Sequence, residues 1–272
     1  MKLMSFIKDG VTGFGAVTGD SVMDFSHKYN DLKTMLASDF DVNEGNLIPL
    51  SEVNFQPVIP NPEKIICVGV NYASHIAEMG REPGEYPLLF TRFANTQVGH
   101  NEPMLAPRES IKFDYEGELA VIIGKGGRKI SENEAMSSIA GYSCYNDGSI
   151  RDWQRHTSQF TAGKNFVGTG GFGPWMISSD EISDPSVLQI ETRLNGNVMQ
   201  SAPISDLVFN VPKLIAYIST FTELEAGDVI ITGTTGGVGA ARKPPVWMKA
   251  GDTVEVEISK IGTLTNPILD AN

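Results

Sequence analysis

Two glutamates separated by one residue are the clearest candidates for chemistry. Glu116 and Glu118 precede the apolar run at residues 119–123, and on a strand their side chains would leave the same face roughly 7 Å apart. The apolar run predicts a position near the edge of the core, where two uncompensated carboxylates would repel each other. A hard divalent cation such as Mg²⁺, Mn²⁺ or Ca²⁺ removes that cost. On pattern alone, the solvated face of an edge strand is the commoner interpretation.

Asp147 is the candidate for a third ligand. It follows the apolar run at residues 139–145 and precedes Gly148, so its carboxylate could reach the same point from a neighbouring strand. The alternatives are an Asx-turn or the N-cap of a helix over residues 149–155, because aspartate is common at both positions. The residues alone leave these interpretations open.

A histidine and a glutamate form the candidate acid–base pair. His75 and Glu78 are three residues apart in a segment with helical character, which places both side chains on one face. The carboxylate would orient the imidazole and support its basicity, so the pair could take a proton from water. An exposed helical ion pair is the simpler alternative. The other three histidines have no comparable partner and are interpreted as structural.

Three further polar residues could hold the oxygens of an anionic substrate. Arg151 and Gln154 follow Asp147 at once and are one helical turn apart, while Lys164 lies beside Gly163. A guanidinium or an ammonium group binds carboxylate and carbonyl oxygens well. Ordinary surface polarity is the alternative interpretation.

A glycine-rich turn at residues 232–239 fits the TGxxxGxG pattern of nicotinamide-binding dehydrogenases. A dinucleotide site requires a helix and a second strand after the turn. Here Pro244 and Pro245 follow almost immediately, and 33 residues remain after Gly239. The turn also lacks the lysine of a phosphate-binding P-loop. We therefore interpret it as a turn whose backbone N–H groups and Thr234 could bind a substrate anion.

The elements that must position these residues are mostly strands. Without regular alternation of strands and helices, the pattern predicts an α+β fold that is mainly antiparallel β, with peripheral helices. Asn195-Gly196 predicts a hairpin turn, and Ser131 with Glu134 predicts a capping box. The predicted strands cover residues 64–70, 113–124, 139–147, 188–200, 228–232 and 253–259, and the longest predicted helix covers residues 211–224.

Prolines at positions 57, 60 and 62 mark the best domain boundary, because proline disfavours both helix and strand pairing. We predict a small N-terminal domain over residues 1–53, a linker over 54–63, and a main domain over 64–272. The two cysteines, Cys67 and Cys144, lie in apolar stretches and are interpreted as buried reduced thiols.

Composition excludes several functional classes. The chain has 272 residues, 41% of them hydrophobic and 20% charged, which is typical of a globular protein. Its net charge of −12 opposes binding to nucleic acid. No apolar run approaches the roughly 20 residues of a membrane span, and no signal peptide is apparent. We expect a cytoplasmic protein that uses a small-molecule substrate and does not bind a membrane.

Taken together, these segments resemble the fumarylacetoacetate hydrolase family, particularly its small acylpyruvase-like and bacterial members. The resemblance runs from about Lys64 to Pro267, and it is the ordered set of motifs that is specific. The chain departs from the family pattern at Thr235, where proline is frequent, and in the glycine-rich stretch 167–172. The motifs are Gly69-Val70-Asn71-Tyr72 with His75 and Glu78; Asp114-Tyr115-Glu116 with Glu118-Leu119-Ala120; Asn146-Asp147 with Arg151-Asp152 and Gln154; Lys164 with Gly173-Pro174-Trp175; Gly227-Asp228-Val229-Ile230 with Thr232-Gly233-Thr234; and Gly251-Asp252.

The resemblance implies a mixed β-sandwich or roll with a small N-terminal domain, usually as a homodimer. It implies Mg²⁺ or Mn²⁺ bound by the three carboxylates, and His75 with Glu78 on a segment that orders over the substrate. It also implies substrate oxygens close to a further set of side chains. That set is Lys164, which we predict to be catalytic, with Tyr72, Arg151, Gln154 and Thr234.

These expectations lead to three functional hypotheses. The first is a metal-dependent hydrolase that cleaves a carbon–carbon bond in a 2,4-diketo acid of the acylpyruvate or fumarylpyruvate type, through an enolate. The second keeps the metal site but changes the reaction to oxaloacetate decarboxylation, dehydration of a related oxo acid, or muconate isomerisation, which fold and ligands do not separate. The third is a nonenzymatic protein that is stabilised by its metal.

Overall fold

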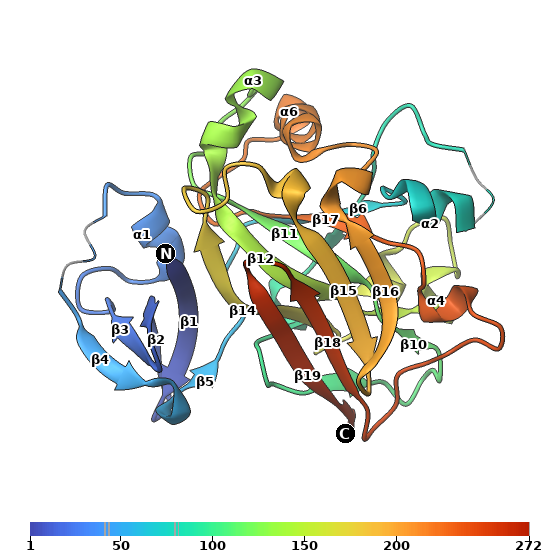
Figure 1. The fold of residues 1–272 in the computed structure, drawn as a ribbon, viewed down its shortest axis with the longest axis horizontal. Coiled ribbons are helices and arrows are strands. Elements are labelled where there is room, and N and C mark those ends of the chain that lie inside the picture. Colours follow the sequence, from blue (N-terminus) through green and yellow to red (C-terminus); the bar gives the residue numbers. More distant parts are fainter. Residues whose placement is uncertain (41, 43, 79, 81, 272) are drawn as a thin grey trace.

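The computed structural model describes residues 1–40, 42, 44–78, 80 and 82–271. The chain forms mainly β-structure, with short helices at the periphery (Figure 1). This confirms the predicted α+β, mainly β fold class. Two sheets account for most of the strands in the described part of the chain, and neighbouring strands are predominantly antiparallel.

The larger sheet joins the N-terminal strands to the strands that follow them in the chain. Its strand order is β4-β3-β2-β1-β14-β12-β11-β17-β6-β7, with β5 paired to β1 and β8 paired to β14. The pairs β17–β6 and β14–β8 are parallel. The strands are β1 (Lys2–Lys8), β2 (Val11–Thr18), β3 (Ser21–Asp24), β4 (Asn46–Pro49), β5 (Asn54–Phe55), β6 (Ile65–Gly69), β7 (Leu88–Arg92), β8 (Gln97–Val98), β11 (Gly117–Ile123), β12 (Ile139–Asp147), β14 (Gly170–Ser178) and β17 (Val229–Thr234).

The second sheet packs against one face of the first. It contains β16 (Asn197–Pro203), β15 (Gln189–Leu194), β18 (Thr253–Ile258), β19 (Gly262–Asp270) and β9 (Met104–Ala106), in that order. The β15–β16 hairpin turns at Asn195 and Gly196, whose φ values are 51° and 75°. Two consecutive residues with positive φ are what a type I′ turn requires. The predicted hairpin is therefore confirmed.

Strand β11 is the centre of the core. Every residue from Gly117 to Ile123 is buried. Leu119 and Val121 pack in a cluster that includes residues of the second sheet, whereas Ala120 and Ile122 pack on the opposite side with N-terminal residues. A strand that is covered on both faces needs a continuous apolar sequence, and residues 119–123 provide one.

The helices are short and lie outside the sheets (Figure 1). The longest, α6 (Val211–Phe221), buries Leu214, Ile215 and Ile218. It ends three residues before the predicted end, because Thr222 is already extended. The predicted capping box at Ser131 opens α3. The other helices are α1 (Leu32–Leu36), α2 (Ala73–Glu78), α3 (Glu132–Ala135), α4 (Arg151–Gln154) and α5 (Thr161–Lys164).

The single strand predicted over residues 113–124 is wrong. The structure divides it into β10 (Phe113–Asp114), which pairs with β13 (Ser149–Ile150), and β11. At the break, side chains replace the backbone ladder: Asn146 Oδ1 accepts from the N–H of Glu116 at 3.0 Å, and Gln200 Oε1 accepts from the N–H of Gly117 at 2.9 Å. Glu116 thus lies before the strand that carries Glu118.

The N-terminal strands β1 to β4 lie together at one side of the molecule (Figure 1). Strand β1 pairs with β14, so this group is hydrogen-bonded to the main sheet. Strand β5 lies inside the predicted linker and also pairs with β1. The division into two domains stays a prediction.

Candidate active site

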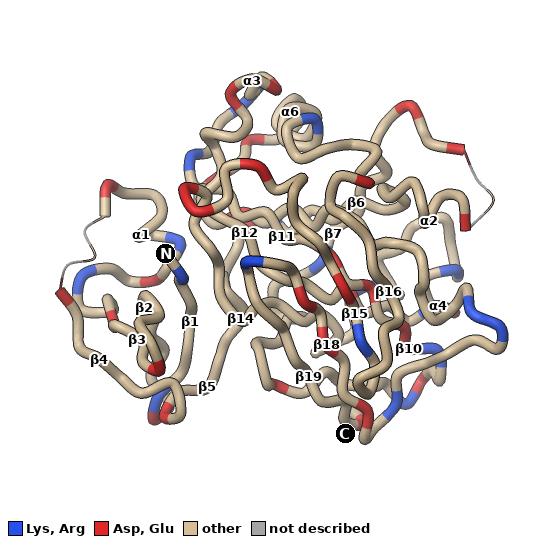
Figure 2. Tube along the Cα trace, viewed as in Figure 1, with Lys and Arg blue, Asp and Glu red and all other residues tan. Residues whose placement is uncertain are grey.

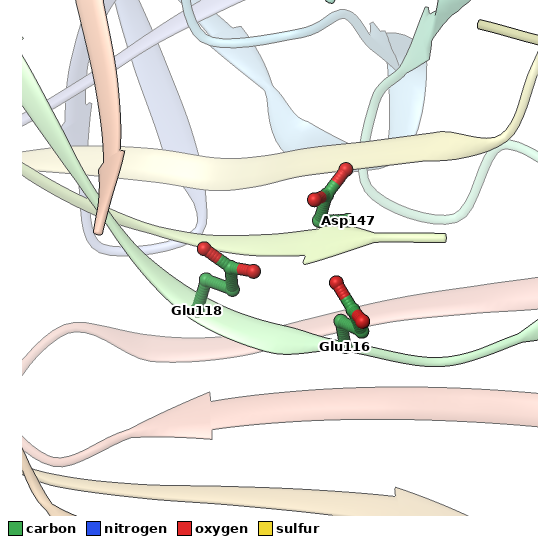
Figure 3. Close-up of side chains that lie close together, drawn as sticks. All are labelled: Glu116, Glu118 and Asp147. Atoms are coloured by element: carbon green, nitrogen blue, oxygen red, sulfur yellow. The ribbon is translucent and has the colours of Figure 1, made fainter. Parts of the chain in front are cut away.

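Three buried carboxylates converge at the end of β11. Ligand oxygens of Glu116, Glu118 and Asp147 all lie within 4.8 Å of one another, and Figure 3 shows the three side chains close together. The residues are only 5%, 2% and 0% exposed. The solvated edge-strand alternative for the two glutamates is therefore wrong.

Strand pairing brings these residues together. Strands β11 and β12 are antiparallel neighbours, with Glu118 opposite Tyr145 and Gly117 opposite Asn146. The N–H of Asp147 then donates to the carbonyl oxygen of Glu116 at 2.8 Å. Asp147 does not cap a helix, because Ile150 precedes α4 in that position. Its carboxylate instead faces the other two.

Gly117 lets the second sheet approach this point closely. A Cβ atom at position 117 would lie 2.0 Å from Oγ1 of Thr192 on β15. The side chain of Thr192 therefore occupies the space that a side chain at position 117 would need. Any side chain at 117 would push β15 away from the site.

Two of the three carboxylates, Glu116 and Asp147, are paired with cations. Lys164 Nζ lies 2.5 Å from Glu116 Oε2 and 2.6 Å from Asp147 Oδ2. Arg151 Nη1 lies 2.7 Å from Glu116 Oε1. Burial acts to raise the pKa of Glu116, but the charges of Arg151 and Lys164 outweigh it and hold that pKa at about 2. Burial likewise acts to lower the pKa of Lys164, and the charges of Asp147 and Glu116 raise it overall.

Glu118 is the carboxylate without a cation. Its Oε2 accepts a hydrogen bond of 2.6 Å from the N–H of Gly233, and no ion pair to it is found in the described residues. Burial, together with the charges of Asp147 and Glu116, raises the pKa of Glu118 well above its usual range. The ionised form of Glu118 would need a nearby positive charge, which no side chain in the described residues provides. A hard divalent cation held by three carboxylates would supply it, so the residues fit Mg²⁺ or Mn²⁺.

A cavity of about 420 Å³ opens beside the carboxylates. His75 and Glu78 of α2 line it together with Glu116 and Glu118. His75 is 7% exposed, and its Nδ1 lies 3.1 Å from Glu78 Oε2. Glu78 Oε1 also accepts from the N–H of Gly237 at 3.0 Å, which ties α2 to the glycine-rich turn. The exposed-pair alternative is therefore wrong for His75, and a titratable pair faces the same space as the carboxylates.

Helix α4 lines another part of this cavity with polar groups. Arg151 Nη1 donates to Gln154 Oε1 at 3.1 Å, and its Nε donates to Asp114 Oδ2 at 2.8 Å. The third nitrogen, Nη2, is buried without a hydrogen-bond partner in the described structure. Because a buried unpaired donor is costly, Nη2 is suited to bind an oxygen of a ligand.

Comparison with known proteins identifies the family. The family model described as Fumarylacetoacetate (FAA) hydrolase C-terminal matches residues 64–269. The chain belongs to the fumarylacetoacetate hydrolase family. The matched region begins where the main domain was predicted to begin.

Curated relatives within the family carry oxaloacetate tautomerase names. The mitochondrial oxaloacetate tautomerase fahd2 of Xenopus laevis is 42% identical over 234 residues, which cover 85% of this chain and 73% of that protein. Oxaloacetate tautomerase YisK of Bacillus subtilis (strain 168) is 43% identical over 223 residues, covering 80% of this chain and 74% of that protein.

Solved structures of the family extend over the full chain. A fumarylacetoacetate hydrolase from Exiguobacterium antarcticum has a TM-score of 0.89 and 34% identity, with 100% of both chains covered. A 5-carboxymethyl-2-hydroxymuconate delta-isomerase from Mycobacterium smegmatis has a TM-score of 0.85 and 30% identity, again with 100% of both chains covered. Hydrolases, isomerases and tautomerases thus share this fold.

Within the family site, most of the predicted residues meet at one cavity. The residues that line it include His75, Glu78, Glu116, Glu118, Arg151, Gln154, Lys164 and Thr234. Asp147 joins them through the carboxylate cluster. Their positions are observed, whereas their roles in binding and catalysis stay predictions.

Two of the residues predicted to contact substrate, Thr234 and Tyr72, have surroundings that differ from those of the other predicted residues, and their roles stay predictions. The hydroxyl of Thr234 donates to the carbonyl oxygen of Gly117 at 3.0 Å and accepts from Gln200 Nε2 at 2.8 Å, so it is already engaged. Tyr72 is fully buried in the core cluster between the sheets and is not among the residues that line the cavity. Desolvation and the charges of Glu118 and Asp206 raise the pKa of its hydroxyl.

Sequence reasoning assigned no role to two residues that organise the site. Asp114 accepts from Arg151 and from the N–H groups of Gly239 and Ala240 at 2.7 and 2.9 Å. Arg92, at the end of β7, contacts Asp147. Asp114 belongs to the Asp114-Tyr115-Glu116 motif, but Arg92 carries no local signal, because its partner is 55 residues away.

Proposed function

We propose that this protein catalyses the keto–enol tautomerisation of oxaloacetate or a closely related four-carbon 2-oxo dicarboxylic acid, with a bound divalent metal. The observation that carries the proposal is the shared cavity: three buried carboxylates, one of them without a cation, lie beside the His75–Glu78 pair. The tautomerase names of relatives that are 42% and 43% identical support the choice of reaction. The sequence alone favours a hydrolase first and an enzyme acting on oxaloacetate or a related oxo acid second. The names of the relatives agree better with the second hypothesis.

The three carboxylates would bind the metal, and nearby cations would bind the substrate or position the carboxylates. Glu116, Glu118 and Asp147 would bind Mg²⁺ or Mn²⁺, which when present would polarise the 2-oxo group as a Lewis acid. Arg151 lines the cavity and has one buried nitrogen, Nη2, without a hydrogen-bond partner, so it would donate to a substrate oxygen. Lys164 would hold Glu116 and Asp147 in place through its two short contacts.

His75 would move the proton. Its Nδ1 faces Glu78 Oε2, so Nε2 is the ring atom free to exchange a proton with the substrate. In the enol-forming direction, the C–H bond at C3 would break, its proton would pass to Nε2 and its electron pair would become the C2=C3 double bond. The proton on Nε2 would then pass to the former 2-oxo oxygen and form the O–H bond of the enol. No oxidant, water or leaving group is required, and the reverse path returns the keto form.

Hydrolytic carbon–carbon cleavage of a 2,4-diketo acid is the second candidate. The His75–Glu78 pair could activate water as well as accept a carbon-bound proton. The fumarylacetoacetate hydrolase from Exiguobacterium antarcticum, whose structure has a TM-score of 0.89, supports this candidate. Hydrolysis, decarboxylation and isomerisation would all use the same carboxylates, so substrate choice has to separate them.

The test is turnover of a small substrate panel by chelator-treated protein, with and without added Mg²⁺ or Mn²⁺. Oxaloacetate enolisation is followed by enol absorbance, decarboxylation by CO₂ release, and cleavage of acetylpyruvate and fumarylpyruvate by loss of the diketone. We expect metal-dependent enolisation to be the fastest reaction. Faster diketone cleavage would favour the hydrolase, and CO₂ release as the main reaction would favour the decarboxylase. Turnover that is unaffected by metal removal would contradict the proposed role of the metal.

Cellular location and assembly stay predictions. In the described part of the chain, no helix is long and apolar enough to cross a membrane. The relatives include a mitochondrial and a bacterial protein. We propose a homodimer, which a measurement of molar mass in solution would test.

A further inference from the structure

Arg155 is an exposed cation on the wall of the catalytic cavity. It follows the last residue of α4 and lines the cavity together with Glu118 and His75. Its backbone N–H closes the end of α4 by donating to the carbonyl oxygens of Asp152 and Trp153. Among the described residues, the guanidinium itself has no hydrogen bond or ion pair. The group is therefore free to bind a ligand.

The other cations that line the cavity are already committed. Lys164 contacts Glu116 and Asp147, and Arg151 contacts Asp114 and Glu116. Both side chains are nearly inaccessible to solvent. Within the part of the chain that the structure describes, Arg155 is thus the lining cation whose charge no carboxylate offsets.

The acidic surroundings of the cavity would repel an anionic ligand unless a cation such as Arg155 offsets them. The chain carries a net charge of −12, and Figure 2 shows Asp and Glu spread over the whole molecule. The cavity wall itself contains Glu78, Glu116 and Glu118. A ligand with two carboxylates would meet repulsion from this field, and a metal at one end would offset only the nearer carboxylate. The farther one needs a second cation.

We propose that Arg155 binds the carboxylate that lies farthest from the reacting carbonyl. It would make the cavity selective for four-carbon 2-oxo dicarboxylates over acids with a neutral end. This inference rests on the proposed function, because it takes the first carboxylate to bind beside the three-carboxylate cluster. Arginine suits the role, since its planar fork can donate two parallel hydrogen bonds to one carboxylate.

The test compares two unreactive ligands that differ at one end. Malate and 2-hydroxybutyrate present the same 2-hydroxy acid group, but malate ends in a carboxylate where 2-hydroxybutyrate ends in a methyl group. Their dissociation constants are measured by calorimetric titration of the Mn²⁺-loaded protein. The variants are Arg155→Met, Arg155→Lys and, as a control, Arg108→Met, which removes the same charge from an exposed arginine at a different cavity.

We expect the wild-type protein and Arg108→Met to prefer malate. Arg155→Met should weaken malate binding about tenfold, as for the loss of one charge-assisted contact, and leave 2-hydroxybutyrate unchanged. Arg155→Lys should retain part of the preference. A malate preference that survives in Arg155→Met, or that is missing from the wild-type protein, would overturn the proposal.

The outcome for Arg155 is separable from the outcome for the proposed function. The two ligands are not turned over, so their binding reports on the carboxylate subsite alone. A protein that prefers malate through Arg155 but does not enolise oxaloacetate would refute the tautomerase and leave the subsite intact. A protein that enolises oxaloacetate with an unchanged KM in Arg155→Met would refute the subsite and leave the tautomerase intact.

Discussion

Arg92 Nη1 donates to Asp147 Oδ1 at 2.7 Å, and both side chains are completely buried. The same guanidinium donates to the carbonyl oxygen of Gly148 at 3.0 Å and to Thr169 Oγ1 at 2.8 Å. One oxygen of Asp147 is thereby fixed, and the other oxygen faces Lys164. We therefore interpret Arg92 as a positioning residue, because it would act on a bound metal through Asp147.

Replacing Arg92 should weaken metal binding before it affects anything else in the cavity. Arg92→Met leaves one oxygen of Asp147 without its partner, and we expect Mn²⁺ affinity to fall about 10- to 100-fold. The protein should also lose about 3 kcal/mol of stability, as when a buried ion pair is broken. Arg92→Lys keeps the charge and should recover part of the affinity. Titration with Mn²⁺ and thermal unfolding measure the two effects.

A surface arginine provides the matched control for this variant. Arg193 pairs with Glu191, Glu255 and Glu257 on the second sheet. Arg193→Met should lower stability slightly and leave Mn²⁺ affinity unchanged. Equal losses of Mn²⁺ affinity in both variants would show that Arg92 acts through general stability rather than through Asp147.

Glu118→Gln should separate stability from metal binding. The carboxyl group is buried beside two carboxylates and has no cation, which raises its pKa, so a neutral amide removes the free-energy cost of burying an ionisable group there in the metal-free protein. The amide oxygen of the introduced glutamine could still accept the hydrogen bond from Gly233, which the wild-type side chain receives at 2.6 Å. We expect the metal-free Tm to rise by a few degrees, while Mn²⁺ affinity falls about 100-fold or more. A metal-free Tm that falls would contradict this account of the charge balance.

His75→Ala should lower kcat by about 100-fold or more for oxaloacetate enolisation, with little change in KM and in Mn²⁺ affinity. Glu78→Gln should have a smaller effect, because glutamine can keep the contact with Gly237 and loses only the charge that supports the imidazole. His27→Ala, which changes an exposed histidine, is the control. A large rise in KM with kcat unchanged would assign His75 to binding instead.

Because the two buried thiols have raised pKa values, we expect the free energy of unfolding to fall in alkaline solution. Burial raises the pKa of Cys144 to about 12, and burial with the charges of Asp147 and Glu118 raises the pKa of Cys67 well above its usual range. The folded state therefore keeps these protons while the unfolded chain loses them above about pH 8.5. Their contribution is fully present below that pH and is lost as the pH rises toward the folded pKa, by about 1 kcal/mol per thiol per pH unit.

Urea unfolding between pH 7 and 10 measures this dependence. The double variant Cys67→Ala/Cys144→Ala should be less stable at pH 7, because it leaves small gaps in the core. Its stability should nevertheless decline less steeply with pH than that of the wild-type protein. Parallel pH profiles would rule out the thiols as the source of the decline.

Local patterns were sufficient wherever a property depends on neighbouring residues. The hairpin at Asn195 and the capping box at Ser131 follow from turn and helix-end chemistry, and both are present. The buried thiols follow from the apolar stretches that contain them. The spacing of His75 and Glu78 predicted a shared helix face, and their side chains are in contact.

The sequence by itself therefore determined the strand-rich architecture, the family resemblance and the identity of the three carboxylates. Tertiary structure alone decided which charges compensate them. Glu116, Lys164 and Arg151 meet across three separate segments, and Arg92 reaches Asp147 from a strand 55 residues earlier. Only the structure shows that Glu116 lies before the strand that carries Glu118, and that the hydroxyl of Thr234 accepts a hydrogen bond from Gln200. The physical reason is that hydrogen-bond partners and desolvation arise from packing between distant segments, which no local pattern encodes.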